Sequence, residues 1–189
     1  FTLIEMVVSI SIIMMVTILF IANYHSANKR TDLIMAAQNL AADLHFAQNS
    51  TLGLTKYNGL LPAGGWGISF DASSSSYTLF ADLQDPGVSG YMQYNPDEEG
   101  NVRYGARVTQ LSDKIKVVSL RTFSGPSDSV GTENLHVNVT FLPPDPQTNI
   151  YRVSTAATAT ALEIKLQETQ NNSFKTIRVN FLGLMEVKD

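Results

Sequence analysis

Residues that could catalyse a reaction or bind a metal are few and scattered in this chain of 189 residues. It contains three histidines, His25, His45 and His136, and no cysteine, which excludes thiol catalysis, disulfides and cysteine-ligated metals. His25 and His45 would lie about 30 Å apart on one predicted helix, too far to share a metal ion. We expect each histidine to be a polar surface residue. No G-x-S-x-G, H-E-x-x-H or phosphate-binding loop pattern occurs, so the sequence predicts no enzyme.

The segment "NPDEEGN" at 95–101 gathers three carboxylates, Asp97, Glu98 and Glu99. Calcium prefers several oxygen ligands from a flexible loop, and these residues are weak candidates for such a site. The alternative, which we prefer, is a solvated acidic turn, because the spacing does not match an EF-hand. We therefore expect no cofactor, with calcium as the one ligand that this turn suggests.

A single carboxylate, Glu5, interrupts an otherwise apolar run from Phe1 to Ala22. A carboxylate at the centre of a membrane helix costs about 2.5–3.5 kcal/mol, and less near an end, where this one lies. One interpretation places Glu5 at the level of the lipid headgroups without a partner. The other pairs it with the α-amino group of Phe1, either in the same helix or in a neighbouring copy, where a buried ion pair would set the register.

The apolar run is long enough to cross a membrane, since 22 helical residues span about 33 Å. It has no basic stretch before it and no small-residue cleavage site after it, so it does not fit a secretory signal peptide. We expect that a leader was removed before Phe1 and that the apolar segment remains in the mature protein.

A helical pattern continues beyond the apolar run. Apolar residues recur every three or four positions at Leu33, Ala37, Leu40, Leu44 and Ala47, which predicts one buried helix face. One helix from about residue 2 to 51, ending at Gly53, is the favoured interpretation; two helices with a break at 23–28 are the alternative. The expected organisation is a membrane or filament-core helix at 1–27, an amphipathic helix half at 28–53 and a globular head at 54–189.

The head shows the period of two that is typical of β-strands. Alternating segments lie at 66–83, read as a hairpin, and at 114–120, 135–142, 162–168 and 175–183, while 154–161 reads as an edge strand or surface ribbon. One-sided alternation predicts a single antiparallel sheet, a β-meander with one wet face, packed on the helix stripe. The fold class is therefore α+β.

The first segment, "FTLIEMVVSISIIMMVTILF", resembles the mature N-terminus of type IV pilins and of the pseudopilins of type II secretion. The resemblance implies that Phe1 is the cleavage and N-methylation site and that Glu5 pairs with the N-terminus of a neighbour during assembly. Ala22 stands where many of these pilins have a proline, so the helix lacks that kinking residue. The resemblance implies a filament core formed by Leu3, Ile4, Val7, Val8, Ile12, Ile13, Met14, Val16, Leu19 and Phe20.

The family implies a structural subunit of a type IV pilus-like filament that serves adhesion, twitching motility or DNA uptake. Its partners would be copies of itself, prepilin peptidase, an assembly ATPase, an inner-membrane platform protein and minor pilins. The chain would cross the inner membrane once before assembly and lie in a surface filament afterwards. DNA binding is not indicated, because the net charge is −4 and no basic tract exists.

Two alternatives remain open. "GWGISFD" and "KTIRVNFLGLMEV" loosely resemble the H-type minor pseudopilins, which would place the chain in a type II secretion system. A membrane-tethered enzyme or sensor head is the other alternative.

Overall fold

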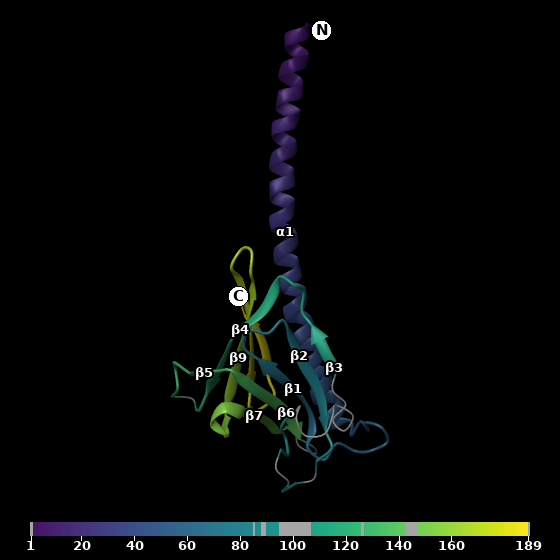
Figure 1. Ribbon diagram of the computed structural model, residues 1–189, viewed down its shortest axis with the longest axis vertical. Helices are drawn as coiled ribbons and strands as arrows, with labels where there is room; N and C mark the ends of the chain where they lie inside the picture. Colours follow the sequence, from purple (N-terminus) through teal and green to yellow (C-terminus); the bar gives the residue numbers. More distant parts are fainter. Residues whose placement is uncertain are drawn as a thin grey trace.

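The computed structural model describes residues 2–84, 86–87, 90–94, 107–125, 127–142 and 147–188, without the side chains of 22–30. One helix, α1 (Leu3–Leu52), runs without interruption for 50 residues. Its first half projects from a β-rich head and its second half is embedded in that head (Figure 1). The single-helix prediction is confirmed, and the two-helix alternative is wrong.

The head contains two antiparallel sheets within the described residues. The six-stranded sheet has the order β3-β2-β1-β6-β7-β8 and the five-stranded sheet the order β11-β10-β9-β4-β5. The strands are β1 (Gly65–Asp71), β2 (Ser76–Asp82), β3 (Arg107–Gln110), β4 (Ile115–Phe123), β5 (Thr132–Asn134), β6 (His136–Leu142), β7 (Gln147–Arg152), β8 (Ala157–Ala159), β9 (Ala161–Glu168), β10 (Ser173–Asn180) and β11 (Met185–Lys188), with a 3-10 turn, η1, at Val153–Thr155.

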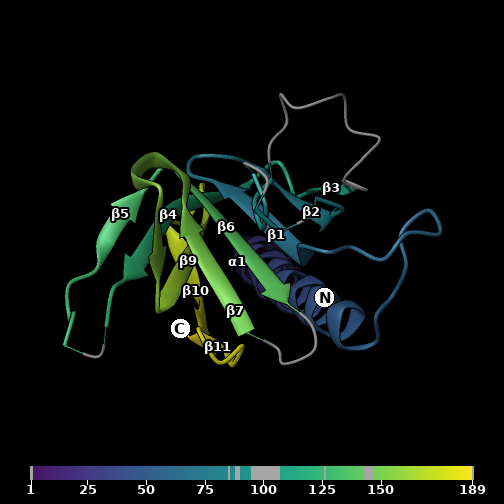
Figure 2. The same ribbon diagram turned by 90° about the horizontal axis from the view of Figure 1, so that it is seen from below.

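The α+β class is confirmed, but the single β-meander is wrong. Strands distant in sequence are neighbours: β1 pairs with β6, and β4 pairs with β9. Helix α1 contacts β1 and β6 of one sheet and β9, β10 and β11 of the other. The two sheets therefore share one core around the helix (Figure 2).

The predicted helix stripe is the centre of this core. Its five members, Leu33, Ala37, Leu40, Leu44 and Ala47, are all buried in one hydrophobic cluster with residues from both sheets. Thr51 fixes the end of the helix to the sheet, because its hydroxyl donates to the Phe141 carbonyl at 3.1 Å and accepts the Trp66 amide at 3.1 Å. The helix ends at Gly53 as predicted.

The expectation of one wet face is wrong for the central strands β1 and β6 of the six-stranded sheet. Residues of β1 and β6 are buried on both sides, including the outward-facing Ser69 and Asn138. Residues 90–94 cover part of this outer face: Thr140 donates to the Met92 carbonyl at 2.9 Å, and Tyr94 packs on Phe80. Met92 and Tyr94 thus help to bury the outer side of this sheet.

Strand ends account for the remaining differences. Leu135 was expected on a buried strand face but is 77% exposed, because β6 begins only at His136. Phe181 is 54% exposed because β10 ends at Asn180. The edge strand expected in 154–161 is confirmed as β8, whereas β3, β5, β7 and β11 were not predicted.

Candidate functional site: an apolar helix with one carboxylate

The first part of α1 carries no tertiary packing. Leu3–Ile21, hereafter the bare helix, is long and apolar enough to cross a membrane, and none of its 19 residues is buried. Its length is about 28 Å, close to the 30 Å of a bilayer core. The residues expected to form a filament core all lie on it and are exposed: Leu3, Ile4, Val7, Val8, Ile12, Ile13, Met14, Val16, Leu19 and Phe20.

Hydroxyl groups on the bare helix are satisfied within the helix. Ser9, Ser11 and Thr17 each donate to the carbonyl four residues earlier, all at 2.8 Å. Such internal hydrogen bonds remove the cost of placing a hydroxyl in hydrocarbon. The bare helix therefore suits an apolar environment despite these three polar residues.

Glu5 takes part in the helix start, which the sequence reasoning missed. The Thr2 hydroxyl accepts the Glu5 amide at 3.4 Å, and the Glu5 carboxylate accepts the Thr2 amide at 3.4 Å, so the pair forms a capping box. The spacing Thr-x-x-Glu was the available signal. Among the described residues, the capping contact is made by one carboxylate oxygen, Oε2. Phe1, the predicted partner, lies outside the described residues.

A polar cluster locks the second half of α1 to the six-stranded sheet. Asp43 accepts from Arg107 of β3 at 2.6 Å and from the Tyr77 hydroxyl of β2 at 2.9 Å. Burial, followed by the hydrogen bond to Asp43, raises the pKa of Tyr77 far above its usual range. Tyr77 is therefore a neutral donor at any physiological pH, and the cluster fixes the helix to the head.

Three residues form a serine–histidine–aspartate chain of contacts on the outer face of β1 and β6. The Ser69 hydroxyl lies 2.9 Å from His136 Nε2, and His136 Nδ1 lies 3.2 Å from Asp71. This order matches hydrolytic triads, but Ser69 is only 3% exposed. A substrate carbonyl cannot reach a nucleophile buried in the sheet, so the contacts tie two strands together. His136 is thus partly buried rather than a simple surface residue, while His45 is exposed as expected.

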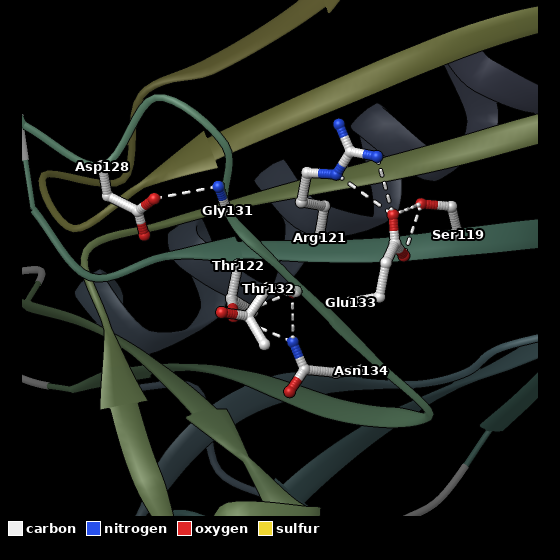
Figure 3. Close-up of polar contacts among 8 residues, drawn as sticks. All are labelled: Ser119, Arg121, Thr122, Asp128, Gly131, Thr132, Glu133 and Asn134. Carbon is white, nitrogen blue, oxygen red and sulfur yellow. Dashed lines mark hydrogen bonds and ion pairs between the residues drawn. The ribbon is translucent and has the colours of Figure 1, made fainter.

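Charged side chains on the outer face of the five-stranded sheet bind one another. Glu133 of β5 accepts from Arg121 at 2.9 Å and from Ser119 at 2.8 Å (Figure 3). Asp128 accepts the Gly131 amide at 2.9 Å (Figure 3), and this hydrogen bond lowers its pKa. The arginine of this hairpin is already paired with a carboxylate, which disfavours the surface as a phosphate-binding site.

Within the described ranges, no group of three histidines or carboxylates is placed to hold a metal ion. The weak calcium candidates Asp97, Glu98 and Glu99 lie outside those ranges, so their prediction is not tested.

Comparison with known proteins adds nothing to this geometry: no protein family, no curated protein and no solved structure matches the chain. Its function must therefore be inferred from its own residues.

Proposed function

We propose that this chain is a structural subunit of a type IV pilus-like filament. In this proposal the bare helix holds the subunit in the inner membrane and later forms the filament core, while the two-sheet head faces outward as a pilin head. The subunit itself has no catalytic role. The N-terminal "FTLIE" resemblance and the physical character of α1 point in the same direction.

One observation carries the proposal: a wholly exposed apolar helix continues without a break into a helix buried in a folded head. In lipid, the bare helix is solvated by hydrocarbon. In a bundle of identical helices it would exchange lipid for protein side chains of the same polarity, so the transfer has a small hydrophobic cost. A single rigid helix also transmits force between core and head.

Glu5 supports self-association rather than simple anchoring. An anchor gains nothing from a carboxylate that costs free energy in hydrocarbon, and a capping box needs only a neutral glutamine at this position. A neighbouring copy offers a cation, the N-terminal amine that the pilin resemblance implies. The proposed pair would offset the cost of the charge and set the axial register.

The family resemblance supplies the proposed partners and location. Prepilin peptidase would cleave and methylate at Phe1, an assembly ATPase and platform protein would drive extraction from the membrane, and minor pilins would initiate the fibre. The filament would lie outside the cell and serve adhesion, motility or DNA uptake.

Electron microscopy of filaments sheared from the cell surface, with mass spectrometry of their subunits, tests the proposal. Long fibres composed mainly of this chain, with N-methylated Phe1, are the expected result. If the chain stays in the membrane fraction and copurifies with secretion components, it is instead a pseudopilin of a type II secretion system. A monomeric chain that remains in the membrane and forms no filament would contradict both.

A further inference from the structure

Exposed leucines surround the C-terminal end of α1. Six of them form what we call the distal collar, and each is between 47% and 65% exposed; they are Leu52, Leu54, Leu60, Leu61, Leu182 and Leu184. Apolar patches of this kind on a soluble head commonly mark an interaction surface.

Contacts with α1 bring the two sides of the collar together. The turn between β10 and β11 meets the helix where Gln48 Nε2 donates to the Gly183 carbonyl at 3.3 Å, one turn before Leu52. On the other side, Leu54 and Leu61 line one small cleft with Trp66. Seen from below, the chain leaving α1 and strand β11 lie on either side of the helix end (Figure 2). Leu182 and Leu184 thus flank a residue that contacts the last turns of α1, and Leu54 and Leu61 lie together just beyond its end.

Neither the membrane nor the chain's own bare helix can cover this collar. Gln48 lies 27 residues beyond Ile21 on one continuous helix, a separation of about 40 Å. A bilayer that surrounds the bare helix thus ends far from the collar. The continuity of α1 also prevents the bare helix from folding back onto its own head.

We propose that the distal collar binds the bare helix of a second copy of this chain. Both surfaces are apolar, and among the charged residues only Glu5 lies on the bare helix, near its far end. This inference rests on the proposed filament and adds a contact between head and core. It also fixes an offset: if the middle of the bare helix, Ile12, meets the level of Gln48, the two copies are displaced by about 54 Å along their helices.

Cysteine cross-linking tests the contact cleanly, because the chain contains no cysteine. Leu184→Cys is combined in turn with Ile12→Cys, Ile13→Cys and Met14→Cys, which sample the helix circumference in steps of about 100°. Leu135→Cys, at a site that is 77% exposed but far from the collar along the chain, replaces Leu184→Cys in the matched control. A disulfide requires Cα atoms within about 7 Å, so any product with the bare helix must join two copies.

Assembled filaments and detergent-solubilised subunits are oxidised and run on non-reducing gels. We expect at least one collar pair to give about tenfold more dimer than the matched control in filaments, and no excess in detergent, where micelles cover the bare helix. Filaments in which all three collar pairs match the control would overturn the inference and leave the filament proposal standing. If the cysteine-free parent forms no filaments in the cells that produce it, the proposed function fails and the inference fails with it.

Discussion

Substitutions at Glu5 and Thr2 separate the two roles that one carboxylate could have. Glu5→Gln keeps a side chain that can complete the capping box but removes the charge. Thr2→Val removes the capping hydroxyl and keeps the charge. If Glu5 pairs with a cation of a neighbouring copy, only the first change should prevent assembly.

The structure sets the expected magnitudes. Both capping hydrogen bonds are 3.4 Å long, at the weak end of the range, so losing the Thr2 hydroxyl should cost about 1 kcal/mol or less. Removing one partner of a buried ion pair costs about 3–5 kcal/mol, because the other charge is left unpaired. Since about 1.4 kcal/mol is a factor of ten, Glu5→Gln should lower the subunit association constant at least about 100-fold, and Thr2→Val by less than tenfold.

The assay compares the amount of the chain in sheared filaments with the amount left in the membrane. Mass spectrometry of the N-terminus controls for processing, so that a cleavage defect is not taken for an assembly defect. Wild-type filament yield from Glu5→Gln would refute the pairing argument and reduce Glu5 to a helix cap. Equal losses from Glu5→Gln and Thr2→Val would show that the helix start, rather than the charge, controls assembly.

Three further predictions concern the head, and equilibrium unfolding of the full chain in detergent checks each. Burial raises the pKa of Asp82 to about 6 from 3.8, so the folded state binds this proton more tightly than the unfolded state does. The free energy of unfolding therefore falls as the pH rises from about 4 through 6, because the folded protein loses the bound proton. Asp82→Asn should remove about 3 kcal/mol of this fall between pH 4 and 8. Leu44→Ala should cost about 2–5 kcal/mol, whereas Ile12→Ala should leave head stability unchanged. Gly65→Ala should be clearly worse than Gly59→Ala, because both have positive φ but only a Cβ at Gly65 would meet the Phe141 carbonyl; equal costs would contradict this reasoning.

Helix α1 could be predicted from sequence because its signals are local. The apolar run, the stripe from Leu33 to Ala47 and the glycine at 53 each specify the conformation of their own neighbourhood. The strands were recognised for the same reason, since alternation in β1, β6, β9 and β10 is visible within a few residues. Pairing was not local: nothing in β1 or β6 specifies that these strands, which start 71 residues apart, lie side by side.

The candidate site divides in the same way. Exposure of the bare helix follows from composition, and Glu5 was identified because a charge in an apolar run is costly. The capping box was visible in Thr2-x-x-Glu5 and was missed. The contact between Ser69 and His136 could not be foreseen, because it depends on the register that places β1 beside β6.

The buried side of α1 and its bare segment differ in what they require from other residues. The stripe at Leu33 to Ala47 is covered within the same chain, so its hydrophobic burial contributes to the stability of each isolated subunit. None of Leu3–Ile21 is buried, and the leucines of the distal collar are only partly covered; water is the least favourable solvent for both. One chain therefore carries two uncovered apolar surfaces about 54 Å apart on a rigid axis. A symmetric dimer covers these surfaces within one closed pair and leaves none to bind a third copy. In a head-to-core contact, by contrast, one copy keeps a free bare helix and the other keeps a free distal collar. An apolar surface at each end of a rigid rod thus favours an open helical polymer, which is the assembly that the proposed function requires.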